Sequence, residues 1–266
     1  MRLCTFLDAG RTRLGSVLGE TVQPLDGRDV RDALHGGLPA ALGDPRALAG
    51  VTLAAPLVPG KLLGIGLNYR DHAAEIGSPL PEEPLVFSKL VTSVTGPASE
   101  VRLPAYTREL DYEGELAVVI GRRARDVAEA DALAHVFGYA VMNDITARDR
   151  QRSEPQWTRA KGGDTFGPFG PWVTTADEVP DPQALRIRTW VGDDLRQDAG
   201  TDEMVFSVAA LVAWCSASFT LEPGDVISTG TPAGVGVARS PQAFLAAGDR
   251  VRVEIEGLGA LDNPIR

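Results

Sequence analysis

Acidic side chains enter what reads as a buried β-strand. Residues 111–121 have the sequence DYEGELAVVIG, in which Asp111, Glu113 and Glu115 accompany a run of branched apolar residues. Because side chains alternate between the two faces of a strand, these three acids share one face. Carboxylates buried together lose hydration and repel one another unless a cation neutralises them. The stretch alone leaves two interpretations open, a cation site or a strand that begins in solvent.

A second apolar segment also ends at an acid. Residues 137–144 have the sequence FGYAVMND and read as a strand that presents Asp144 at its end. If this end lies beside Glu113 and Glu115, the three carboxylates form an all-oxygen shell. Such a shell favours the hard ions Mg²⁺, Mn²⁺ or Ca²⁺ over zinc. The alternative is that Asp144 caps a helix that begins near Thr146.

One of the three histidines has an acid at helical spacing. His72 follows the apolar segment at residues 61–67, and Glu75 lies three residues further along the chain. A carboxylate bonded to imidazole fixes its tautomer and raises its basicity, which is what a general base needs. The alternative is an ordinary surface pair. His35 and His135 are interpreted as helix residues without a catalytic role.

Two glycine-rich stretches indicate shaped loops rather than solvated surface. Lys161 lies in WTRAKGGDTFGPFGP at residues 157–171, where glycines and prolines surround a single lysine. Residues 229–236 read TGTPAGVG, and their hydroxyls and backbone amides, such as that of Gly230, can hold a carboxylate. The second loop lacks the lysine of a phosphate-binding loop, so a nucleotide site is not predicted.

The elements that must position these residues are mostly strands. Short strand-like runs recur from residue 61 onward, whereas clear helical patterns occur at residues 127–136 and 205–218. Strands outnumber helices without regular alternation, which predicts an α+β, mainly β core of mixed sheets rather than a doubly wound α/β sheet.

The first part of the chain reads as a separate small unit. It contains short strands followed by a helical pattern at residues 29–42, which Gly43 closes. Two prolines and a glycine at residues 54–60 are typical of a linker. We therefore expect a small N-terminal domain at residues 1–57 and a catalytic domain at residues 58–266.

Composition narrows the class of protein. The 266 residues are 44% hydrophobic and carry a formal net charge of −10, which predicts a globular protein that binds neither nucleic acid nor anionic membranes. Cys4 and Cys215 form no disulfide framework and no zinc motif. Asp8 and Arg11 interrupt the first apolar stretch, so we expect no signal peptide and a cytoplasmic location.

Six stretches, in order, resemble the fumarylacetoacetate hydrolase family. They cover roughly residues 61–266 and read GLNYRDHAAE, ELDYEGELAVVIG, GYAVMNDITARDRQ, WTRAKGGDTFGPFGP, LEPGDVISTGTPAGVG and GLGALDNP. The resemblance implies a β-rich roll of mixed sheets with a small N-terminal domain, usually as a homodimer. It also implies one divalent cation, Mg²⁺ with Mn²⁺ or Ca²⁺ as alternatives, held by Glu113, Glu115 and Asp144.

The same resemblance implies roles for the remaining candidates. His72 and Glu75 would be the catalytic pair on a lid that orders over the substrate, and Lys161 would contact the developing anion. Gln151 and Thr231 match positions that bind the substrate carboxylate or the water. Asp111 matches a further metal ligand that only some members use. Where relatives commonly have Lys-Pro, this chain has Lys89 followed by Leu90, which is expected to alter the wall of the pocket.

These features predict a divalent-metal-dependent hydrolase or decarboxylase of a small β-diketo or α-keto acid, acting through a metal-stabilised enolate. One alternative is an isomerase or dehydratase (lyase) of a hydroxymuconate-type or secondary-metabolite substrate. Another is a non-catalytic protein that binds small molecules. The presence of Glu113, Glu115, Asp144 and His72 favours the enzyme over the binding protein.

Overall fold

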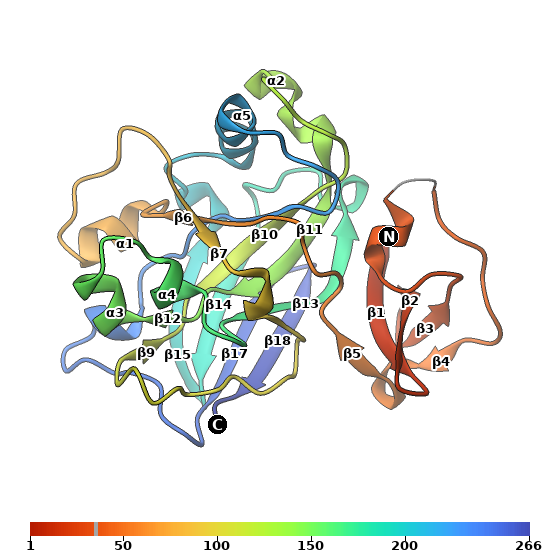
Figure 1. Ribbon diagram of the computed structural model, residues 1–266, viewed down its shortest axis with the longest axis horizontal. Helices are drawn as coiled ribbons and strands as arrows, with labels where there is room; N and C mark the ends of the chain where they lie inside the picture. The colour runs from red at the N-terminus through yellow and green to blue at the C-terminus, as the bar shows by residue number, and fades with distance from the viewer. Residues whose placement is uncertain (35–36) are drawn as a thin grey trace.

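The computed structural model describes residues 1–34 and 37–266, and its main feature is a large mixed β-sheet (Figure 1). Ten strands follow one another across this sheet in the order β4 (Arg46–Ala47), β3 (Thr21–Pro24), β2 (Arg11–Leu18), β1 (Arg2–Asp8), β13 (Gly167–Thr175), β11 (Val136–Asn143), β10 (Gly114–Ile120), β16 (Val226–Ser228), β6 (Leu62–Gly66) and β7 (Leu85–Lys89). Two more join it at the side, β5 (Thr52–Ala54) on β1 and β8 (Val94–Thr95) on β13. The pairs β16–β6 and β13–β8 are parallel, so the sheet is mixed, as predicted.

A second sheet packs against the centre of the first. It has the order β15 (Asp194–Gly200), β14 (Arg186–Val191), β17 (Arg250–Ile255) and β18 (Gly259–Pro264). A short ribbon of β9 (Leu110–Asp111) and β12 (Thr146–Ala147) lies beside the site. Along β10, Leu116 and Val118 face one apolar cluster while Ala117 and Val119 face another, so β10 is buried on both sides. The mainly β architecture predicted from the sequence is confirmed.

Helices are short and lie around the sheets. They are α1 (Arg70–Glu75), α2 (Glu129–Ala132), α3 (Arg148–Ser153), α4 (Thr158–Lys161) and α5 (Val208–Ser218). The predicted helix at residues 205–218 is confirmed by α5, whose first turn is capped by the hydroxyl of Ser207. The pattern at residues 127–136 forms α2 and then a 3₁₀ turn at Leu133–His135.

The prediction of a helix at residues 29–42 is wrong. Among the described residues of this range, the structure has only a 3₁₀ turn at Val30–Ala33, in which the Asp29 side chain accepts a hydrogen bond from the Arg31 amide. Gly37 and Pro39, both poor helix formers, follow soon afterwards and oppose a longer helix. His35, which we expected to be a helix residue, lies outside the described residues.

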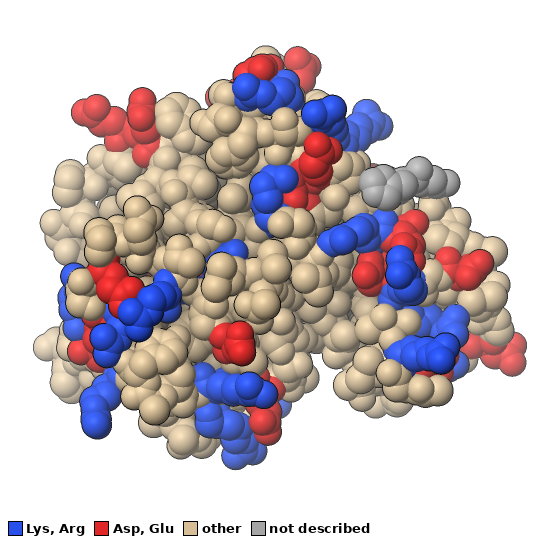
Figure 2. Space-filling model, viewed as in Figure 1, with Lys and Arg blue, Asp and Glu red and all other residues tan. Residues whose placement is uncertain are grey.

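The N-terminal strands and the helices α1, α3 and α4 lie at opposite ends of the molecule (Figure 1). Strand β1 pairs with β13, so strands β1–β5 continue the main sheet. The segment between β5 and β6 contains no helix or strand, and the domain boundary expected at residue 57 stays a prediction. No described helix has the length and apolar character needed to cross a membrane. Figure 2 shows acidic and basic side chains intermixed over this face of the molecule.

Candidate active site

Three acids meet where β10 and β11 share an end. The antiparallel register sets Gly114 opposite Asn143, so Glu113 and Asp144 are neighbours just beyond this pair. The Asp144 amide donates a hydrogen bond of 2.8 Å to the Glu113 carbonyl. One carboxylate oxygen each of Glu113, Glu115 and Asp144 lie within 4.8 Å of one another, and all three residues are buried. The interpretation of a strand that begins in solvent is therefore wrong, and the group is one that could hold a metal ion.

Two lysines and an arginine surround this acidic triad. The ammonium of Lys161 lies 2.6 Å from Glu113 Oε2 and 2.8 Å from Asp144 Oδ2. Lys89 contacts the other oxygen of Asp144, and Arg148 Nη1 lies 2.7 Å from Glu113 Oε1. Burial alone would raise the pKa of Glu113, but Lys161 and Arg148 outweigh it and lower that pKa to about 2. Glu113 is therefore ionised at neutral pH.

Glu115 is compensated less than Glu113. Burial, together with the nearby carboxylates of Asp144 and Glu113, raises the pKa of Glu115 well above its usual value. Its hydrogen-bond donors are neutral, the hydroxyl of Ser228 and the amide of Gly230. Within the described chain, no basic side chain forms an ion pair with Glu115. Glu115 is thus the member of the triad that lacks a direct cationic partner among the described residues.

A histidine and its carboxylate partner lie on the short helix α1. His72 Nδ1 lies 2.8 Å from Glu75 Oε1, and since a carboxylate only accepts, Nδ1 carries the hydrogen. The Glu75 Oε2 atom accepts a second hydrogen bond, from the Gly234 amide at 2.9 Å. His72 is only 6% exposed, so the interpretation as a surface pair is wrong. This arrangement leaves Nε2 as the nitrogen with a free lone pair.

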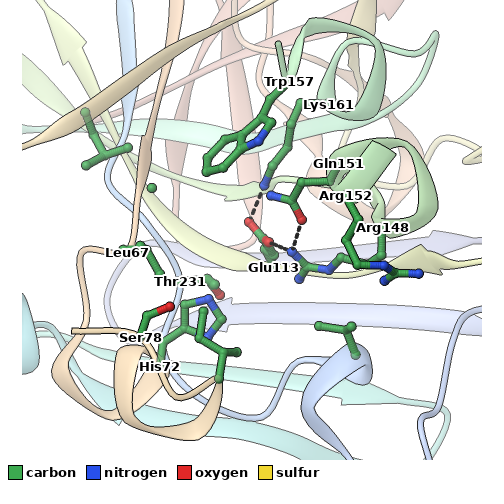
Figure 3. Close-up of a pocket in the computed structure, with 14 residues that line it drawn as sticks. Leu67, His72, Ser78, Glu113, Arg148, Gln151, Arg152, Trp157, Lys161 and Thr231 are labelled. Carbon is green, nitrogen blue, oxygen red and sulfur yellow. Dashed lines mark hydrogen bonds and ion pairs between the residues drawn. The ribbon is translucent and has the colours of Figure 1, made fainter. Parts of the chain in front are cut away.

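His72 and Glu113, one residue from each group, line the same pocket of about 460 Å³ (Figure 3). Its wall includes Leu67, His72, Ser78, Glu113, Arg148, Gln151, Arg152, Trp157, Lys161 and Thr231. Figure 3 shows His72 and Thr231 on one side, with Lys161, Gln151 and Arg148 across from them around Glu113. A pocket of this size fits a small organic acid, and its basic side chains suit a negatively charged one.

Asp111 does not join the triad. The chain leaves the strand between β9 and β10, so the side-chain alternation predicted from Asp111 through Glu115 is interrupted. Asp111 instead accepts hydrogen bonds from Arg148 Nε at 2.8 Å and from the amides of Gly236 and Val237. The possible role as a further metal ligand is wrong in this chain, because Asp111 anchors Arg148 to the loop that follows β16.

The local structure differs from expectation at Asp144 and Lys161. Helix α3 begins at Arg148, and no side chain caps its first turn, so the alternative of Asp144 as a helix cap is wrong. Lys161 is the last residue of helix α4, and the glycine-rich loop only starts after it. The helix explains how Lys161 is held, because its amide bonds to the carbonyl of Trp157 one turn earlier.

The three residues predicted to bind the substrate differ in which of their hydrogen-bond donors and acceptors are still free. Thr231 donates its only hydroxyl hydrogen to the Gly114 carbonyl at 3.0 Å and accepts from Gln197 at 2.8 Å, so toward the pocket it can only accept. The Gly230 amide is already bonded to Glu115. Gln151 accepts from Arg148 through Oε1, and its amide hydrogens have no partner in the described chain.

Sequence reasoning missed three residues that shape the site. Lys89 is buried and donates hydrogen bonds to Asp144 and to the Lys161 carbonyl. The sequence feature that could have indicated it is a lysine at the end of an apolar strand. Arg148 is buried with Nη2 unpartnered among the described residues, and its signal was its place four residues after Asp144. Gln197, which orients Thr231, gave no local signal.

Leu90 does not form part of the pocket wall, contrary to expectation. Its side chain is 49% exposed and does not appear among the residues that line the pocket. It lies instead against the backbone of Gly162, next to Lys161. The change from the usual proline therefore affects the surface beside the site rather than the space for a substrate.

Comparison with known proteins gives matches over the whole chain. The family model for the fumarylacetoacetate (FAA) hydrolase C-terminal domain matches residues 61–266, and a model called Rv2993c-like, N-terminal, matches residues 1–56. The chain is 48% identical over 218 residues to a mitochondrial oxaloacetate tautomerase, fahd2, of Xenopus laevis, covering 81% of this chain and 68% of that protein. It is 43% identical over 266 residues to protein Rv2993c of Mycobacterium tuberculosis, covering 100% and 98%.

Solved structures agree with this picture. A 2-hydroxyhepta-2,4-diene-1,7-dioate isomerase from Mycobacterium marinum is 39% identical with a TM-score of 0.86, covering 100% of this chain and 98% of that one. A fumarylacetoacetate hydrolase from Exiguobacterium antarcticum is 36% identical with a TM-score of 0.90, covering 100% and 99%. The similarity thus extends over both the N-terminal strands and the region of the site.

Proposed function

The chain belongs to the fumarylacetoacetate hydrolase family and is an enzyme of that family, and we propose that it transfers protons at the carbon beside the keto group of a small dicarboxylic acid. The observation that carries this proposal is the pocket that His72, held by Glu75, shares with Glu113 of the acidic triad. Relatives named as a tautomerase and an isomerase support this chemistry. Proton transfer was the alternative to hydrolysis and decarboxylation in the sequence-based prediction.

The acidic triad fits a divalent cation on two observations. Its three members offer only oxygen ligands, and Glu115 is buried beside two carboxylates without a cationic partner in the described chain. Glu113, Glu115 and Asp144 would hold the ion, with Mg²⁺ the first choice and Mn²⁺ or Ca²⁺ as alternatives. A bound divalent cation would polarise the oxygens of a keto acid and make the adjacent carbon more acidic.

His72 is the group that moves the proton. Its Nδ1 is committed to Glu75, so Nε2 accepts a proton from the substrate carbon and can return it to another atom of the same molecule. Glu75 fixes this tautomer and stabilises the imidazolium that forms. One base that takes and returns a proton is sufficient for tautomerisation or for shifting a double bond.

Charged side chains on the opposite wall would bind the substrate anion. Burial opposes the charged form of Lys161, yet Asp144 and Glu113 outweigh it and raise the pKa of Lys161, so its ammonium stays charged. Arg148 has a buried Nη2 without a partner among the described residues, and Gln151 has free amide hydrogens. These donors suit a carboxylate or a developing enolate oxygen.

Hydrolysis of a carbon–carbon bond is the second candidate, and one observation favours it. Thr231 lines the same pocket as His72 and can only accept a hydrogen bond there, so it is suited to hold a water molecule for His72 to activate. The two candidates differ in outcome, because hydrolysis divides the substrate in two whereas proton transfer leaves its atoms together.

The deciding experiment measures exchange and cleavage in one sample. EDTA-treated protein with and without added Mg²⁺ is incubated in D₂O with oxaloacetate, acylpyruvates or hydroxymuconate-type diacids, and products are followed by NMR. Metal-dependent loss of the proton beside the keto group, without cleavage, is the expected result. Cleavage products would instead establish the second candidate. Tight binding without exchange or cleavage on the whole panel would refute both and favour the binding protein.

We also propose a homodimer. Strand β7 is the last strand at its edge of the main sheet, and Leu85, Leu90 and Val91 are exposed on or beside it. An exposed edge strand with apolar neighbours is a surface that proteins usually cover. Light scattering after size exclusion would measure the mass, and a monomer at all concentrations would contradict the proposal.

A further inference from the structure

A chain of three contacts connects the metal-binding end of the core to the proposed base. The hydroxyl of Tyr112, which directly precedes Glu113, donates a hydrogen bond of 2.8 Å to the Gly234 carbonyl. The Gly234 amide donates to Glu75 Oε2 at 2.9 Å, and Glu75 Oε1 lies 2.8 Å from His72 Nδ1. Tyr112 therefore stands behind the catalytic pair without touching the pocket.

Among the residues of this series of contacts, Gly234 has the least restricted backbone dihedral angles. Its φ of +107° lies in the region that favours glycine, and a Cβ at this position would come within 1.9 Å of the Arg196 carbonyl. No other residue fits there without a shift of the backbone. The amide and the carbonyl of Gly234 belong to adjacent peptide units joined at its Cα, and because the φ and ψ of glycine are little restricted, a hydrogen bond that holds the carbonyl narrows the orientations open to the amide. In the structure, the Tyr112 hydroxyl fulfils that role.

We propose that Tyr112 is a positioning residue for proton transfer, which it controls by holding the Gly234 carbonyl and, through the backbone of Gly234, the amide that orients Glu75 and so the tautomer of His72. This inference rests on the proposed function of His72 as the base. It gives a physical reason for a buried tyrosine at this position, where an apolar side chain would avoid the cost of burying a hydroxyl. It also means that the strand of the acidic triad and the helix of the base are aligned by one hydrogen-bonded path.

The first test removes only the hydroxyl. Tyr112→Phe is expected to lower kcat by about ten-fold, since a misdirected base loses much of its effect, while KM and the Mg²⁺ dependence stay within about two-fold. The matched control is Tyr139→Phe, which removes the hydroxyl of another tyrosine of the same apolar cluster, one without a hydrogen bond to the described chain. An equal fall in kcat for both variants, or a parallel loss of Mg²⁺ binding in Tyr112→Phe, would overturn the proposal.

A double-mutant cycle distinguishes positioning from a general structural role. If Tyr112 acts through Glu75, then adding Tyr112→Phe to Glu75→Gln lowers kcat no further, whereas independent effects would multiply. Multiplying effects would overturn the proposed path.

A readout that needs no turnover comes from the imidazole itself. The chain has only three histidines, so ¹⁵N NMR can report the tautomer of His72. The expected result is a single tautomer with hydrogen on Nδ1 in the wild type and Tyr139→Phe, and a mixture in Tyr112→Phe. An unchanged tautomer would overturn the proposal. If no substrate is turned over, the proposed function fails, yet this spectrum still decides whether Tyr112 orients His72.

Discussion

Replacing Glu115 with glutamine is expected to stabilise the metal-free protein at neutral pH and to remove its stabilisation by Mg²⁺. In the structure, burial and the carboxylates of Asp144 and Glu113 raise the pKa of Glu115 well above its usual value. Its hydrogen bonds come from Ser228 and Gly230, and a glutamine carbonyl oxygen can accept both. The substitution therefore removes a charge while the local hydrogen bonds remain possible.

The magnitude follows from the separation of the charges. Two unit charges 4.8 Å apart, the largest separation in the triad, repel by about 3.5 kcal/mol at an effective dielectric constant of about 20. Glu115 faces two such neighbours, and the Lys161 ammonium offsets about one of them. About 3 kcal/mol of destabilisation remains when Glu115 is ionised and no metal is bound.

The effect depends on pH in a definite direction. Because the pKa of Glu115 is higher in the folded than in the unfolded protein, the folded state holds a proton that the unfolded state releases as pH rises above about 4.3. The destabilisation is therefore absent below about pH 4.3 and grows with pH until the folded-state pKa is reached. Glu115→Gln removes this contribution to the pH dependence.

Urea unfolding of EDTA-treated protein between about pH 5 and pH 8, with and without Mg²⁺, measures the effect. The exposed Glu222, which pairs with Arg123 at the surface, supplies the matched control, and Glu222→Gln is expected to change stability by less than about 0.5 kcal/mol. The reasoning is refuted if metal-free Glu115→Gln is less stable than the wild type near neutral pH, or if Mg²⁺ stabilises both equally.

Three further predictions follow from the site. His72→Gln should lower kcat by about 10²–10⁴-fold while calorimetry finds unchanged Mg²⁺ affinity, and equal loss of both would contradict its assignment as base. Asp111→Asn leaves the buried Arg148 without one of its carboxylates, so urea unfolding should show a loss of about 3 kcal/mol; a loss below about 1 kcal/mol would contradict the anchoring role. Leu90→Pro should raise the free energy of unfolding by about 0.4–1 kcal/mol and leave KM unchanged. The reason is that the Leu90 φ of −69° suits proline and the Leu90 amide donates no backbone hydrogen bond in the described chain. A changed KM would contradict the placement of Leu90 outside the pocket.

The sequence singled out Glu113, Glu115 and Asp144 as a candidate group, and the resemblance to a known family implied that the three would meet. Side-chain alternation is a local property of a strand, and it indicated a shared face for Glu113 and Glu115, although only Glu115 lies within β10. A second strand ending in an acid then needed only antiparallel pairing to complete the group, and the observed register supplies it. The spacing of His72 and Glu75 on one helical turn is likewise local, and the two side chains do contact.

The hydrogen-bond partners behind these residues depended on the tertiary structure. Ser228 donates to Glu115 across 113 positions in sequence, and Tyr112 reaches Gly234 across 122. Periodicity carries no information over such separations, because these contacts depend on how distant segments pack. For the same reason the sequence could not show that Asp111 binds Arg148 or that the hydroxyl hydrogen of Thr231 is already committed. The sequence therefore determined which groups the site contains, and the packing of separate segments decided which of their hydrogens and lone pairs remain for a substrate.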